Sequence, residues 1–130
     1  MRYLVILAFV VGHVAAAKAQ TTLDPQKSAN VIGRGCEALL KLLETPRQKL
    51  SPRHPWDIYE GECMGIVETW LDASKLLADD SRFCPPDEAP VDQAIRVVVA
   101  HLKRNPQRTH ESFGRLAHEA LRGAWPCKKP

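Results

Sequence analysis

Four cysteines, Cys36, Cys63, Cys84 and Cys127, are the side chains of this sequence best suited to chemistry. An even number of cysteines in a short exported chain is typical of a disulfide framework. No two of them have the C-x2–4-C spacing of structural zinc sites, and a C-x-x-C redox motif is absent. We therefore expect two disulfide bonds, with no metal site and no redox centre.

The other reactive side chains do not form a recognisable catalytic arrangement. None of the serines lies in a G-x-S-x-G or S-x-x-K context. The histidines after the N-terminal segment include no i, i+4 pair that would place two imidazoles on one helix face. Asp72 falls within an otherwise apolar helix, and we expect an exposed charge there, with an ion pair to Arg96 as the alternative. The sequence therefore predicts a binding protein with no catalytic residues and no cofactor.

The N-terminal segment predicts export into an oxidising compartment. Met1–Tyr3 carries one positive charge, Leu4–Val14 is largely apolar, and Ala17 and Ala19 form an A-x-A pattern. This order is that of a cleaved secretory signal, and the apolar run is shorter than the roughly 20 residues that span a bilayer. We expect cleavage after Ala19 and a periplasmic location, with a retained anchor as the alternative.

Charge argues against nucleic acid as a partner. The full chain has 18 basic and 15 acidic residues, and residues 1–19 contain two of the basic ones and none of the acidic ones. The mature chain is therefore close to neutral, whereas nucleic-acid binding needs a dense basic surface.

The elements that must position the cysteines are helices. Apolar residues recur at helical spacing in four segments, and sustained period-two alternation is absent. The predicted helices cover 29–44, a segment from about Pro55 through Leu77, 91–104 and 108–124. We expect one all-α domain over 20–130, a compact bundle of about four helices.

The position of each cysteine on this map favours one pairing. Cys36 and Cys63 lie on the inward stripes of the first two helices, which we expect to be antiparallel neighbours. Cys84 precedes the third helix and Cys127 follows the fourth, so an antiparallel hairpin would bring these two together. The favoured pairs are Cys36–Cys63 and Cys84–Cys127, with the two other pairings as alternatives.

The cysteines and their flanking residues resemble a known family. Gly61–Gly65 with Asp72-Ala73 is similar to a G-x-C-x-G…D-A core, followed by Phe83-Cys84-x-Pro86 and a terminal Trp125-Pro126-Cys127. This order resembles the Tai/Rap family of immunity proteins, which neutralise amidase effectors of type VI secretion. The chain departs from the family pattern at Thr69, often glycine there, and in the long proline-rich stretch 45–55.

The resemblance implies a function that the residues alone do not indicate. Family members are periplasmic, disulfide-bonded and often homodimeric, and they cover the active cleft of peptidoglycan-cleaving amidases. The expected function is therefore toxin inhibition by protein–protein contact, without enzymatic activity. A periplasmic helical chaperone or stress protein, with no dedicated toxin, is the alternative.

Two loops are the predicted contact surfaces, because recognition is concentrated in loops. The first is the polar turn between the third and fourth helices, with Arg104, Asn105, Gln107 and Arg108 as its candidate contacts. The second is the proline-rich loop 47–56, where Trp56 is the candidate because aromatic residues are enriched at binding hot spots. Two glycines four residues apart, Gly61 and Gly65, would also allow another helix to approach closely, within the chain or across a dimer.

Overall fold

A computed structural model describes residues 24–46 and 58–128, and these residues form four α-helices. The α-helices are α1 (Ala29–Glu44), α2 (Ile58–Ala73), α3 (Val91–Arg104) and α4 (Phe113–Ala124). The same described residues also form three 3-10 helices, namely η1 (Pro25–Lys27), η3 (Ser74–Leu76) and η4 (Pro106–Arg108). The described ranges contain no strand, only an isolated bridge between Ser28 and Ser112. The all-α prediction is confirmed.

Helix α1 has the predicted bounds, and its two ends show why. At its start, the backbone N–H groups of Ala29 and Asn30 donate to the carbonyls of Glu111 (2.8 Å) and Thr109 (2.7 Å). At its end, the Thr45 hydroxyl donates to the Lys41 carbonyl at 2.7 Å, and Pro46 follows. These end groups find partners beyond the regular helical pattern because the first N–H groups and the last carbonyls of a helix have none within it.

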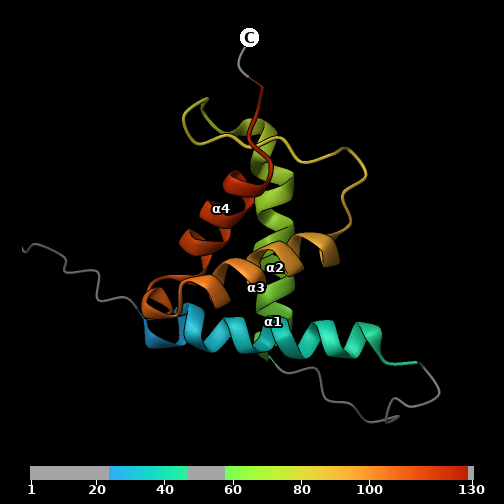
Figure 1. The fold of residues 1–130 in the computed structure, drawn as a ribbon, viewed down its shortest axis with the longest axis vertical. Coiled ribbons are helices and arrows are strands. Elements are labelled where there is room, and N and C mark those ends of the chain that lie inside the picture. Colours follow the sequence, from blue (N-terminus) through green and yellow to red (C-terminus); the bar gives the residue numbers. More distant parts are fainter. Residues whose placement is uncertain (1–23, 47–57, 129–130) are drawn as a thin grey trace, which may run out of the picture.

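Helix α1 crosses α2 instead of running beside it, as Figure 1 shows. The two backbones come close at Gly35, where an added Cβ would lie 2.4 Å from the Tyr59 carbonyl oxygen. One residue further along α1, Cys36 is bonded to Cys63 with a Cα–Cα distance of 5.3 Å. The predicted pairing is confirmed, although the expected antiparallel packing of these helices is wrong: a disulfide needs only one point of contact.

The core lies where all four helices meet. Its fully buried members include Ile32 and Leu39 of α1, Val67 of α2, Ile95 and Val98 of α3, and Phe113, Leu116 and Leu121 of α4. On α2 the buried face is Glu60, Cys63 and Val67, whereas Tyr59, Ile66 and Trp70 of the predicted stripe are half-buried. Helix α2 also ends at Ala73, and η3 continues the chain to Leu76.

The two glycines of α2 face outward. Gly61 and Gly65 are exposed, and no described atom beyond their own helix lies within 4 Å of a Cβ built on either. The prediction that another helix of the chain approaches closely at Gly61 and Gly65 is therefore wrong for the described residues.

The connection from α3 to α4 differs from prediction. Helix α3 has its predicted bounds, but α4 begins at Phe113, five residues later than expected. The carbonyls of Thr109 and Glu111 accept hydrogen bonds from the start of α1, so they are turned away from the direction a helix requires. The buried residues predicted for α4 are nevertheless correct: Phe113, Leu116, Ala117, Ala120 and Leu121.

The second disulfide closes the other end of the molecule. Cys84 and Cys127 are bonded with a Cα–Cα distance of 4.9 Å, and the Cys84 N–H donates to the Trp125 carbonyl at 2.8 Å. The loop that carries Cys84 therefore lies against the chain that leaves α4, and this predicted pairing is also confirmed. Within the described residues, no helix has the length and apolar character needed to cross a bilayer.

Candidate partner-binding site

The turn between α3 and α4 is a polar tip, here defined as residues 104–108. Asn105 leaves helical geometry before Pro106, as the restriction on residues that precede proline predicts. Its side-chain amide donates to the His101 carbonyl at 2.9 Å, so Asn105 caps the end of α3. Arg104 and Gln107 are exposed, and Arg104 makes no ion pair with any described residue. The tip thus presents one unpaired guanidinium and one amide to solvent.

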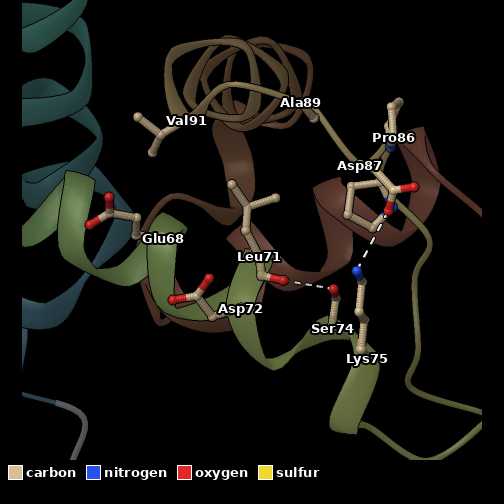
Figure 2. A pocket seen from close by; sticks show the side chains of 10 residues that line it. Glu68, Leu71, Asp72, Ser74, Lys75, Pro86, Asp87, Ala89 and Val91 are labelled. Atoms are coloured by element: carbon tan, nitrogen blue, oxygen red, sulfur yellow. Dashed lines mark hydrogen bonds and ion pairs between the residues drawn. The ribbon is translucent and has the colours of Figure 1, made fainter.

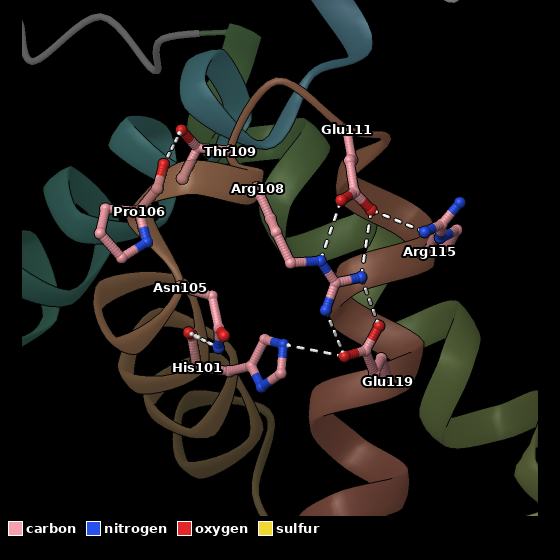
Figure 3. A network of polar contacts seen from close by, with 8 residues as sticks. All are labelled: His101, Asn105, Pro106, Arg108, Thr109, Glu111, Arg115 and Glu119. Atoms are coloured by element: carbon pink, nitrogen blue, oxygen red, sulfur yellow. Dashed lines mark hydrogen bonds and ion pairs between the residues drawn. The ribbon is translucent and has the colours of Figure 1, made fainter.

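Arg108 anchors the tip through a network of charged hydrogen bonds, drawn in Figure 3. Its guanidinium donates to Glu111 at 2.9 and 3.1 Å and to Glu119 of α4 at 2.6 and 2.8 Å. Arg115 adds a bond to Glu111 at 2.7 Å, and the His101 ring lies 3.6 Å from Glu119. One network therefore joins the end of α3, the tip and two turns of α4.

The hydrogen bonds of the network shift the pKa of its members in the direction that favours their charged forms. The hydrogen bonds that Arg108 donates to Glu119 and Glu111 raise the pKa of its guanidinium above its usual value. Hydrogen bonds from Arg108 hold the pKa of Glu111 and of Glu119 below the usual value of 4.5. All three groups are therefore charged over the neutral range, and the tip is held most firmly there.

The tip also rests on the start of α1. Backbone bonds from Ala29 and Asn30 hold the segment that follows it, as described above. A shallow hollow of about 350 Å³ opens beside this junction, lined by Pro25, Ser28, Asn30, Pro106, Gln107, Thr109 and His110. The turn is thus braced from both sides, which lowers the entropy lost when a partner binds it.

These contacts divide the predicted contact residues into two kinds. Arg104 and Gln107 are exposed, whereas Asn105 and Arg108 hold the tip in shape. Trp56 and the proline-rich loop 47–56 lie outside the described residues. Sequence reasoning missed Glu119 as a partner of Arg108, because in one continuous helix these residues would stand about 16 Å apart.

A second polar surface, the acidic groove, runs between α2 and the loop before α3 (Figure 2). It encloses about 520 Å³ and is lined by Glu68, Leu71, Asp72, Ser74, Lys75, Pro85, Pro86, Asp87, Ala89 and Val91. Lys75 and Asp87 pair across it at 3.5 Å, while Glu68 and Asp72 make no ion pair with described residues. Asp72 is exposed as expected, and the alternative is wrong: Arg96 instead pairs with Glu44 at 2.7 Å.

The histidines serve packing and hydrogen bonding. The His118 ring packs on Trp70 at a centroid distance of 4.5 Å, and its Nε2 lies 2.8 Å from the Ser81 carbonyl oxygen. His101 belongs to the Arg108 network, and His110 is exposed at its edge. Within 24–46 and 58–128, no three His, Cys, Asp or Glu side chains are grouped so as to hold a metal ion.

Comparison with known proteins finds one protein family that the chain matches. The family model for Rap1a immunity proteins matches residues 37–127, which is more than half of the chain. This range contains the tip, the acidic groove and three of the four cysteines. No curated protein and no solved structure matches the chain.

Proposed function

The chain belongs to the Rap1a immunity protein family, and on that premise we propose that it binds and blocks a peptidoglycan amidase effector of type VI secretion. The family match over residues 37–127 carries this proposal. Two disulfides agree with an oxidising compartment such as the periplasm, into which residues 1–19 would direct the chain as a cleaved signal. The inhibitor itself performs no chemistry: it excludes substrate by covering the effector's active cleft.

The tip supports this mode of inhibition because it is exposed and braced at once. Arg104 offers an unpaired guanidinium, and arginine is enriched among residues that dominate binding energy. Arg108 keeps the turn rigid through both glutamates, so little ordering remains to be done on binding. We therefore place the effector contact at Arg104 and Gln107, with Asn105 and Arg108 as the residues that position them.

The oligomeric state belongs to the same proposal. Homodimers are common in the family that the sequence resembles, and we propose that this chain also forms one. Light scattering coupled to size exclusion tests this directly, because the mass of one chain is 14.5 kDa including residues 1–19. A dimer mass at micromolar concentration supports the proposal, and a monomer mass there contradicts it.

Capture of the effector is the first test of function. Oxidised residues 20–130 are immobilised and exposed to purified type VI amidase effectors mixed with periplasmic extract. Stoichiometric capture of one amidase supports an immunity function. Capture of a mixed set of unfolded proteins, with no amidase among them, would favour the chaperone alternative.

Site variants then locate the contact. Arg104→Glu should weaken effector binding about tenfold or more, since it replaces a contact cation with a repelling charge. The matched control is Arg122→Glu, another exposed arginine without an ion pair in the described chain, but in the last turn of α4. Asp72→Lys reports on the acidic groove. If Asp72→Lys weakens effector binding and Arg104→Glu does not, the effector contacts the acidic groove and not the tip.

A further inference from the structure

The two disulfides differ in their access to solvent. Cys36 and Cys63 are both 0% exposed, and they lie in the core at the crossing of α1 and α2. Cys84, in contrast, is exposed, and Cys127 is partly exposed at the end of the chain. Thiol–disulfide exchange requires a thiolate to reach one of the two sulfurs. The difference in solvent access should therefore give the two disulfides different reactivity toward thiols.

The surroundings of Cys127 favour opening of the exposed bond. Cys127 lines a hollow of about 710 Å³ together with Asp79, Asp80, Arg82, Arg122, Pro126 and Lys128. Arg82 is paired with Asp79 at 2.6 Å. Arg122 and Lys128, however, are exposed and form no ion pair with described residues. The hollow thus holds three cations and two carboxylates, and Arg122 and Lys128 are the cations available to stabilise a thiolate that leaves from Cys127.

Other contacts would keep the fold closed after the bond opens. The Cys84 N–H still donates to the Trp125 carbonyl, and the His118 ring still bonds to the Ser81 carbonyl. Phe83, next to Cys84, is 1% exposed and packs in the core. Cys36–Cys63 joins α1 to α2 independently. Opening of Cys84–Cys127 therefore releases the end of the chain without requiring the helices to separate.

We propose that Cys84–Cys127 is an exchangeable disulfide that reacts with a dithiol reductant in the folded protein, while Cys36–Cys63 is inert until the protein unfolds. This inference does not depend on the identity of any effector. It assigns the two bonds separate roles: one holds the helix crossing permanently, and the other is a reversible closure of the C-terminal segment.

The exchange proceeds in two balanced steps. A thiolate of the dithiol attacks the sulfur of Cys84, an exposed residue, the S–S bond breaks, and its electron pair leaves on Cys127, which lines one hollow with Arg122 and Lys128. The second thiolate of the reductant then attacks its own sulfur in the mixed disulfide and releases Cys84. The reductant ends as a cyclic disulfide, and the two protons of its thiols end on Cys84 and Cys127.

Timed reduction by dithiothreitol tests the proposal on the oxidised wild-type chain. Samples are quenched with iodoacetamide, and the labelled cysteines are identified by peptide mass spectrometry. We expect Cys84 and Cys127 to be labelled at least about tenfold faster than Cys36 and Cys63, with an unchanged helical circular dichroism spectrum. Simultaneous labelling of all four, or earlier labelling of Cys36 and Cys63, would overturn the proposal.

Charge reversal near the leaving sulfur tests the direction of attack. The double variant Arg122→Glu with Lys128→Glu should slow the opening of Cys84–Cys127 several-fold, because it removes both cations near the departing thiolate. Arg104→Glu, in the tip at the other end of α4, is the control and should leave the rate unchanged. Equal rates in all three proteins would overturn the role given to Arg122 and Lys128.

Discussion

Arg108 shows how a single side chain can fix the shape of a turn. It lies in a 3-10 helix, yet its guanidinium reaches Glu119 in the middle of α4 as well as nearby Glu111. Two carboxylates that share one guanidinium in this way form short, charge-assisted hydrogen bonds with fixed geometry. The candidate contact residue Arg104 is therefore held on a rigid turn.

The network predicts a specific dependence of stability on pH. Because the pKa of Glu111 and of Glu119 is lowered by folding, the unfolded chain binds more protons at acidic pH. The contribution of both carboxylates is therefore complete above their usual pKa of 4.5, and it is lost as pH falls through their lower folded values. We expect the melting temperature to fall as the pH drops below 4.5.

Arg108→Gln separates this network from other acid-sensitive groups. The variant should melt at a lower temperature than the wild type at pH 7, and the gap in melting temperature should narrow toward pH 3, as the pH falls below 4.5 toward the lowered pKa of the two carboxylates. Thermal melts followed by circular dichroism at both values make the comparison. A gap that stays constant with pH would show that the network does not stabilise the fold through its charges.

At the scale of the helices, the crossing of α1 and α2 depends on the absence of a side chain. Gly35→Ala would place a Cβ 2.4 Å from the Tyr59 carbonyl oxygen, and backbone cannot yield as a flexible side chain can. We expect it to lower the free energy of unfolding by about 1–3 kcal/mol, the usual range for overpacking.

Gly123→Ala is the matched control for this prediction. No described atom outside its own helix lies within 4 Å of a Cβ built there, and the residue is exposed in the last turn of α4. This change should raise the free energy of unfolding by up to about 1 kcal/mol, because alanine favours helix over glycine. Urea denaturation measures both variants, and equal effects would show that the crossing tolerates a side chain at Gly35.

The spacing of apolar residues predicted the bounds of a helix correctly where residues near its ends in the sequence decide where it begins and stops. The bounds of α1 and α3 were predictable, because Pro46, Pro90 and Pro106 limit them. The start of α4 was not, since hydrogen bonds from α1 turn the carbonyls of Thr109 and Glu111 aside. The spacing of apolar residues along the sequence does not indicate tertiary contacts of this kind.

The candidate site was predictable to a similar degree. Prolines and polar residues located the tip, and the cysteine positions gave both disulfide pairs. The Arg108–Glu119 bond and the acidic groove were missed because each joins residues from separate elements. Spacing within one helix cannot indicate them.

On the scale of the molecule, a chain with a net charge of only +3 separates its charges along the sequence. Residues 68–92 contain seven acidic and two basic residues, whereas residues 93–128 contain seven basic and two acidic residues. The first range includes the acidic groove, and the second includes the tip. Such an uneven charge distribution steers a complementary partner during diffusion.

Steering predicts a salt effect on effector binding. Added salt should lower the association rate constant more than it changes the dissociation rate constant, because screening acts mainly on the approach of exposed charges. Surface plasmon resonance at 50 and 500 mM NaCl would measure both constants. An association rate constant that does not change with salt would contradict a role for the separated charges.

The central claim is that this protein neutralises an amidase effector by occupying its active cleft. The most direct measurement is peptidoglycan cleavage by the captured amidase, titrated with the oxidised chain 20–130. We expect amidase activity to fall linearly to near zero at an equimolar ratio, and we expect Arg104→Glu to shift this titration to higher concentration. Full amidase activity in the presence of excess bound protein would contradict it.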